Sequence, residues 1–161
     1  MSDKQPDLDE LANDLRRSQT FFNRSTSALG EAHSSFAPKD GMMSAAAQIM
    51  HVALTVEWFV DGAFSATGFD MNFEEHLREA NACASLEAAR QRLDAAFDRA
   101  VSMVEHKTVD EWSAAIADGP VMGGLPRATV LGGIIEHTAH HRGALTVYTR
   151  LQGLEPPMPY M

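Results

Sequence analysis

Apolar residues recur at spacings of three or four along four long segments of the chain. This spacing is typical of an amphipathic α-helix, in which positions i, i+3, i+4 and i+7 form one face. The segments cover residues 7–29, 42–65, 85–106 and 126–152. No alternating pattern typical of strands persists between them. Because each helix has to bury its apolar face, we predict an all-α protein in which four helices form one bundle.

Residue types at the ends of these segments support the predicted limits. Ser85 is a good N-cap for the third helix, and Pro126 suits the first position of the fourth. Gly153 is the residue type preferred just after a helix, and Pro156 and Pro157 prevent the helix from continuing. We therefore expect the fourth helix to start at Pro126 and to end before Gly153.

Residues 33–41, 67–84 and 107–125 contain turn residues and are predicted as loops. The second and third of these, at about 18 residues each, exceed ordinary helix connections, so we expect them to cross the bundle or to border a site. The chain of 161 residues has the usual size of one domain and shows no boundary that would divide it. We therefore expect a single domain over residues 1–161.

The composition excludes several classes of protein. A formal net charge of −9 opposes binding to the phosphate backbone of nucleic acids. The sequence shows neither a secretory signal nor an apolar run of about 20 residues, so we expect a cytoplasmic protein that does not insert into a membrane. Cys83 is the only cysteine, which excludes an internal disulfide and a cysteine-rich zinc site. We interpret it as an incidental thiol.

Three histidines are candidates for binding a metal ion. His137 and His141 are four residues apart in the fourth predicted helix, so their rings share one helix face. His51 lies beside the apolar stripe of the second helix and would complete a site of three nitrogens, which zinc and its neighbours accept. Spacing alone leaves open the alternative that these histidines only lie at the edge of the core or face solvent. His140 also offers a competing pair with His137.

Two segments resemble a known family. Residues 134–160, IIEHTAHHRGALTVYTRLQGLEPPMPY, contain the pattern H-x-x-H-H-R-G followed by R-x-x-G-x-x-P. This pattern resembles the C-terminal signature of the DinB/YfiT-like family. Residues 50–59, MHVALTVEWF, resemble that family's first ligand segment, in which a His is followed by Glu and Trp. The resemblance implies a four-helix bundle in up-down-down-up order with one long crossover connection.

The resemblance also implies a divalent metal ion held by three histidines. On the matching positions of this chain the ligands are His51, His137 and His141. Zinc and nickel are the first candidates for the metal, with iron and manganese as alternatives. His140 matches a family position that is not usually a ligand, and Gly143 is expected to allow close packing of helices.

The function implied by this site is that of an enzyme. We expect a metal-dependent thiol S-transferase or hydrolase that activates a low-molecular-weight thiol or water for attack on a small electrophile. The alternative is a non-catalytic metal-binding or stress-induced protein. A homodimer is also expected, because members of the family often pair through helix faces, and Phe21, Phe22 and Phe59 would supply apolar area.

Other polar residues carry further predictions. Glu57 points away from His51 and is expected to form a salt bridge on the surface or between helices. Arg142 and Arg150 are expected to be solvated or ion-paired, with contact to an anionic substrate as the alternative. No general base is evident, and His140 qualifies only if its ring faces the cleft.

Overall fold

The computed structural model describes residues 6–161, which form helices and no strand, so the prediction of an all-α protein is confirmed. One isolated antiparallel bridge joins Ala115 to Pro126. Within this part of the chain no helix is long and apolar enough to cross a bilayer. The helices are α1 (Leu8–Thr26), α2 (Ala45–Phe64), α3 (Phe73–Ala82), α4 (Leu86–His106), α5 (Val109–Ser113) and α6 (Thr129–Leu151), with a 3-10 turn over Glu31–His33.

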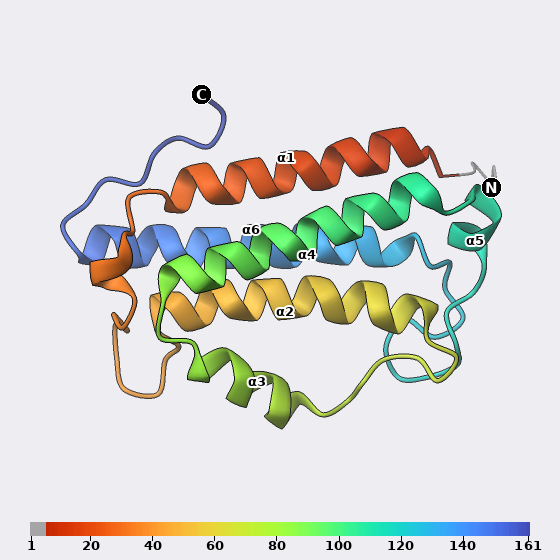
Figure 1. The fold of residues 1–161 in the computed structure, drawn as a ribbon, viewed down its shortest axis with the longest axis horizontal. Coiled ribbons are helices and arrows are strands. Elements are labelled where there is room, and N and C mark those ends of the chain that lie inside the picture. Colours follow the sequence, from red (N-terminus) through yellow and green to blue (C-terminus); the bar gives the residue numbers. More distant parts are fainter. Residues whose placement is uncertain (1–5) are drawn as a thin grey trace.

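The four long helices α1, α2, α4 and α6 form a bundle in up-down-down-up order (Figure 1). α1 and α6 run in one direction along the bundle, and α2 and α4 run in the other. Residues 65–85 therefore lead the chain back along the bundle from the end of α2 to the start of α4. This segment, called the crossover below, carries α3, which packs on α2. The fold implied by the family resemblance is confirmed.

Side-chain caps begin three of the long helices. The side chains of Asp7, Ser44 and Ser85 each accept a hydrogen bond from a backbone amide in the first turn of the helix that follows. Such a bond satisfies one of the amides that a helix start leaves without a partner. The cap predicted at Ser85 is confirmed.

The start of α6 differs from the prediction, because Pro126 is not helical. Pro126 lies in the antiparallel bridge with Ala115, where the amide of Arg127 donates to the carbonyl of Ala114 at 3.0 Å. Bonds to a distant segment hold this stretch out of the helix, and α6 begins only at Thr129.

A helix also occupies much of the segment predicted as a loop at residues 67–84. The side chain of Asn72 accepts a hydrogen bond from the amide of Glu75 at 3.3 Å and caps α3. Glu74 and Glu75 lie in the first turn, where carboxylates complement the helix dipole. Ala80 is the only buried residue of α3, so the apolar pattern that would predict this helix is weak.

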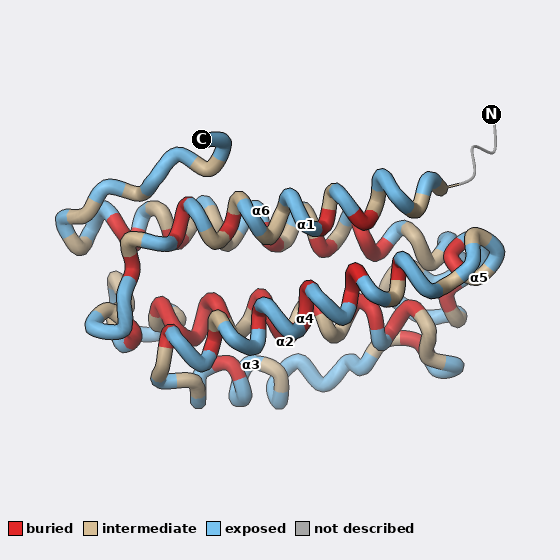
Figure 2. Tube along the Cα trace, turned by 45° about the horizontal axis from the view of Figure 1, so that its top comes forward, coloured by how far each residue is buried: buried red, intermediate tan, exposed pale blue. Residues whose placement is uncertain are grey.

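The core lies between the inward faces of the long helices (Figure 2). Phe22 of α1 is fully buried in it, and Trp112 of α5 closes one end against Phe64, with ring centroids 4.9 Å apart. Phe59 of α2 is also buried. The expectation that Phe22 and Phe59 supply apolar area for a dimer is therefore wrong, because both rings are used in the core of one chain.

Gly62 and Gly133 allow close packing against their helices, and Gly143 does not. A Cβ at Gly62 would overlap the ring of Phe69, and a Cβ at Gly133 would lie 2.9 Å from the ring of Phe59. Gly143 is exposed, and a Cβ there would meet no atom within 4 Å. The packing role predicted for Gly143 is therefore wrong.

Candidate metal-binding site

The facing sides of α2 and α6 bring three histidines together. His51 comes from α2, and His137 and His141 come from successive turns of α6. One nitrogen from each ring lies within 4.8 Å of the other two. The ring centroids are 5.0 Å apart for His51 and His137, 4.9 Å for His51 and His141, and 4.5 Å for His137 and His141. The structure therefore gathers the three residues that spacing and resemblance indicate.

The distance between two of these nitrogens fits a shared metal ion. Nε2 of His51 and Nε2 of His137 are 3.2 Å apart. Two nitrogens bound to one tetrahedral zinc ion at about 2.0–2.1 Å are separated by roughly 3.3 Å. Both rings can thus reach one ion with little movement, and imidazole nitrogen is a donor that divalent transition metals accept.

Gln48 orients the third ring. It lies one turn before His51 on α2, is 6% exposed, and places Oε1 3.0 Å from Nδ1 of His141. Because an amide oxygen only accepts hydrogen bonds, the proton of His141 belongs on Nδ1 and the lone pair on Nε2. Histidines that bind metals usually have such a partner on the second nitrogen. The sequence-based candidates omit Gln48, although a lone glutamine in the apolar run AAAQIM, on the same helix face as His51, is a signal for it.

Burial keeps these histidines neutral. It is the main cause that lowers the pKa of His137 to about 4 and the pKa of His141 to about 3, and the charges of neighbouring histidines are the second cause. Burial also lowers the pKa of His51, with a smaller contribution from His76. Near neutral pH each ring therefore has a lone pair available, which metal binding requires. Nδ1 of His137 is buried and has no hydrogen-bond partner among the described residues.

A cavity of about 230 Å³ lies against two of the histidines, between α2, α3 and α6. A small molecule can approach His51 and His137 there. The remaining lining is largely apolar and aromatic, with one further histidine: Leu54, Thr55, Trp58, Phe59, Phe73 and His76.

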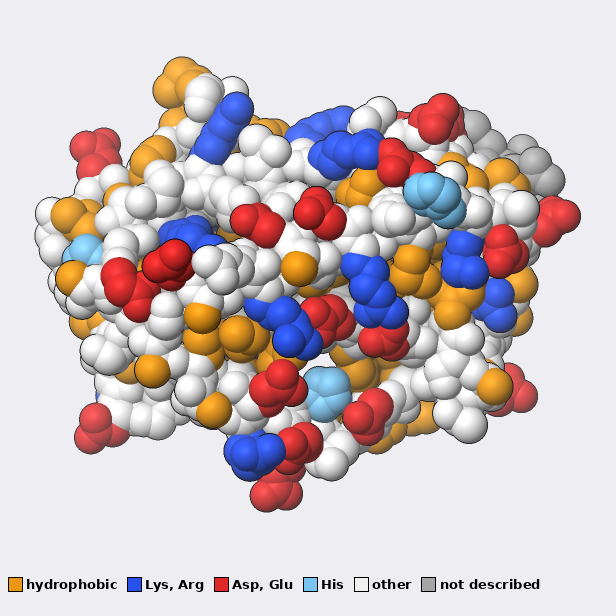
Figure 3. All heavy atoms as spheres, viewed as in Figure 1, with side chains coloured by type: hydrophobic (Ala, Val, Ile, Leu, Met, Phe, Trp, Pro, Cys, Tyr) orange, Lys and Arg blue, Asp and Glu red, His pale blue; other side chains and the backbone are white. Residues whose placement is uncertain are grey.

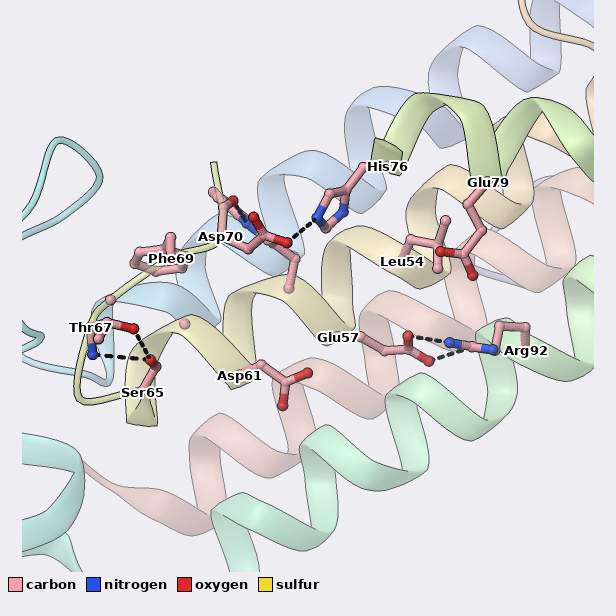
Figure 4. Close-up of a pocket in the computed structure, with 13 residues that line it drawn as sticks. Leu54, Glu57, Asp61, Ser65, Thr67, Phe69, Asp70, His76, Glu79 and Arg92 are labelled. Atoms are coloured by element: carbon pink, nitrogen blue, oxygen red, sulfur yellow. Dashed lines mark hydrogen bonds and ion pairs between the residues drawn. The ribbon is translucent and has the colours of Figure 1, made fainter. Parts of the chain in front are cut away.

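A larger, polar cavity of about 520 Å³ adjoins the first, between α2, the crossover and α4 (Figure 4). The two cavities share Leu54, Trp58 and His76. In Figure 3, acidic and basic side chains surround a hollow on this face of the molecule. Glu57 accepts hydrogen bonds from Arg92 at 2.5 and 2.7 Å, so the salt bridge predicted for Glu57 is confirmed.

The other predicted polar residues lie away from both cavities. His140 is exposed, and its ring packs edge-on against His141 with centroids 5.0 Å apart, so it does not face the cleft. Arg142 lies over the ring of Phe21 on the side of α6 that faces α1. Arg150 is exposed near the end of α6. Neither arginine lines a cavity at the histidines.

Comparisons with known proteins agree with this architecture. A family model described as the DinB family matches residues 1–161. Among solved structures, a mycothiol-dependent maleylpyruvate isomerase superposes with a TM-score of 0.72 at 16% sequence identity, over 87% of this chain and 61% of the isomerase. YfiT from Bacillus subtilis is described as a probable metal-dependent hydrolase with an unusual four-helix bundle topology. It gives a TM-score of 0.70 at 14% identity, over 96% of this chain and 92% of YfiT.

A DinB-like protein from Bacillus subtilis gives a TM-score of 0.68 at 17% identity, over 92% of this chain and 95% of that protein. The chain thus spans less than two thirds of the length of the isomerase and nearly all of the other two. At these identities the likeness establishes the fold alone. A comparison with curated protein sequences found no match.

Proposed function

Because this chain belongs to the DinB family, we propose that it is a metal-dependent enzyme acting on a small molecule. His51, His137 and His141 bind one divalent metal ion in this proposal. The observation that carries it is the convergence of three neutral imidazoles, from two helices, beside a cavity of about 230 Å³. Histidines that merely lay at the edge of the core would have no reason to converge on one point or to border a cavity.

Zinc and nickel are the metals that we propose first. Three neutral nitrogen donors leave the ion its full positive charge, and they leave coordination positions for water or substrate. Iron and manganese are alternatives, because geometry and supply select among these ions as much as the ligand type does.

The reaction that suits this site is attack by a small thiol or by water on an electrophile. A divalent metal at the three histidines would favour the deprotonated form of either nucleophile. The side chains of this chain supply the rest: Gln48 holds His141 in the required tautomer, and Trp58, Phe59 and Phe73 line the approach with aromatic rings. Two structural neighbours support the two options, since one is described as a mycothiol-dependent isomerase and another as a probable metal-dependent hydrolase.

Metal content is the first test. Protein purified without chelator or nickel resin should carry about one ion per chain by elemental analysis, and replacing any one of the three histidines by Ala should abolish this content. His140→Ala is the matched control, because it removes an exposed imidazole from the same helix and should leave the ion in place. A metal content that stays near zero after reloading would contradict the proposal.

Turnover is the second test. Metal-loaded protein is incubated with small thiols and a chromogenic electrophile, and separately with an ester for hydrolysis. Turnover should depend on the metal and disappear in His141→Ala. Activity that survives this substitution would remove the metal from the mechanism, whereas stoichiometric metal without turnover would favour a non-catalytic metal-binding protein.

A further inference from the structure

The crossover brings a fourth histidine to the cavity in front of the metal site. His76 lies on α3 and lines both cavities, together with His51 and His137 in the smaller one. Its side chain is 27% exposed, so a bound molecule can reach it. His76 is not among the three residues whose nitrogens lie within 4.8 Å of one another. It therefore borders the site without being one of its candidate ligands.

Asp70 holds the ring of His76 (Figure 4). Oδ2 of Asp70 is 3.4 Å from Nε2 of His76, and Oδ1 accepts a hydrogen bond from the amide of Asn72 at 2.9 Å. The bond from this amide, followed by the bond to His76, lowers the pKa of Asp70, so its side chain is a carboxylate near neutral pH. Because a carboxylate only accepts, the proton of neutral His76 belongs on Nε2 and the lone pair on Nδ1.

Contacts with α2 fix the position of this pair. Nε1 of Trp58 donates a hydrogen bond to the carbonyl of Asp70 at 2.6 Å, and its ring packs on Phe69 with centroids 4.5 Å apart. The missing Cβ of Gly62 leaves room for the ring of Phe69. The helix that carries His51 thus also anchors the crossover, which keeps His76 at a set place beside the metal site.

We propose that His76 is the residue that transfers protons in this site, with Asp70 as its positioning residue; the assignment rests on the function proposed above. The S–H proton of a thiol in the cavity moves to Nδ1 of His76. This step leaves a thiolate and an imidazolium whose Nε2–H stays bonded to Asp70. The sulfur lone pair then forms a bond to the electrophilic carbon, the π electrons of that carbon move to its neighbouring atom, and the imidazolium returns the proton there.

The surroundings of His76 suit this step. The positive charge that the ring acquires lies near the carboxylates of Asp70 and Glu75, and Glu79 lines the same larger cavity. Arg92 is the basic side chain of that cavity, and it is already paired with Glu57. The proton moves between the thiol, His76 and the product, so no further reactant is needed.

The test compares turnover of two thiols, with His106→Gln, which removes an exposed histidine from α4, as the matched control that should behave like the wild type. General base catalysis contributes about 10²–10⁴-fold, so His76→Gln should lower kcat by this factor for an alkyl thiol. The loss should be much smaller for an aromatic thiol that is already ionised near neutral pH. Asp70→Asn should lower kcat less than His76→Gln does, with unchanged metal content. A purely structural role would lower kcat equally for both thiols.

The outcomes separate this assignment from the proposed function. Equal losses for both thiols would overturn the role of His76 and leave the metal-dependent function intact. Loss of metal from His76→Gln would identify His76 as a metal ligand and would also overturn its role in proton transfer. A metal-loaded wild type that binds no thiol would overturn the thiol-dependent function and this assignment together.

Discussion

At the scale of single residues, the hydrogen bond between Gln48 and His141 decides which nitrogen of that ring is free for a metal. Gln48→Leu removes the acceptor and leaves the part-buried Nδ1–H of His141 without its protein partner. We expect metal affinity to fall by about 10–100-fold, the usual effect of losing a partner of this kind. Competition with a chromogenic chelator measures the affinity, and ¹⁵N shifts of the imidazole report the tautomer in the metal-free protein.

Gln48→Glu is the control for this prediction, because a carboxylate also accepts from Nδ1–H. It should keep the tautomer and an affinity close to that of the wild type. If Gln48→Leu bound the metal as tightly as Gln48→Glu, the orienting role of this side chain would be refuted.

The low pKa values of the histidines make the metal-free protein sensitive to acid. His137 and His141 titrate near pH 4 and 3 in the folded state, whereas an unfolded chain protonates them near pH 6.5. As pH falls below 6.5 the unfolded state binds protons that the folded state does not, so the free energy of unfolding decreases down to about pH 4 for the part due to His137 and about pH 3 for the part due to His141. Above pH 6.5 this loss is absent.

Urea unfolding at pH values above and below this window, in the presence of a chelator, checks the prediction. His137→Gln should lose less stability on acidification than the wild type, because it lacks one of the three histidines whose pKa burial lowers. His106→Gln should keep the slope of the wild type. Identical slopes for all three proteins would show that burial does not keep His137 neutral.

At the scale of the elements, the sequence predicted what repeats along a helix and missed what depends on distant contacts. The limits of α2 and α4 agree within about three residues, because amphipathic spacing and caps such as Ser85 are local signals. The predicted start of α6 at Pro126 was wrong, since the bridge from Pro126 to Ala115 forms only in the folded chain. Spacing and family resemblance together predicted that His51, His137 and His141 would lie close to one another.

His76 could not have been found in this way. α3 has almost no buried face, so its segment reads as a loop, and the place of His76 depends on the path of the crossover over α2. Gln48 left a signal, a single amide in an apolar run, but its partner on α6 is 93 residues away in the sequence.

The contact between Gly62 and Phe69 gives a prediction about the crossover. Gly62→Ala places a methyl group where the ring of Phe69 lies, and overpacking of this kind costs about 1–3 kcal/mol. We expect a lower free energy of unfolding and weaker thiol binding, since Trp58 packs on Phe69 and anchors Asp70. Urea unfolding and calorimetry measure both effects.

Gly143→Ala is the control for the crossover prediction. It also adds a methyl group within a long helix, but it meets no neighbour there. It should be neutral or gain up to about 1 kcal/mol from helix propensity. Equal effects of Gly62→Ala and Gly143→Ala would mean that the crossover adjusts freely and does not hold Asp70 in place.

At the scale of the whole molecule, the topology creates the cavities. Because α2 and α4 run in the same direction, the chain between them has to return along the bundle, and it does so over α2 (Figure 1). The returning segment carries α3 and closes a wall over the side of α2 that bears His51. A short turn between antiparallel helices would leave this face open to solvent.

The proposed metal site joins parts of the chain on both sides of the crossover, so an ion bound there should stabilise the whole fold. An ion that binds only the folded state, at a concentration about 1,000 times its Kd, contributes about 4 kcal/mol. For a chain of this size that corresponds to a rise in Tm of roughly 8–16 °C. Calorimetry of the wild type with metal and with chelator should show this difference, and His141→Ala should show almost none. His140→Ala should respond like the wild type, since its ring lies outside the site. If the Tm of the wild type were the same with metal and with chelator, no ion would connect α2 and α6, whatever the distances between the three rings.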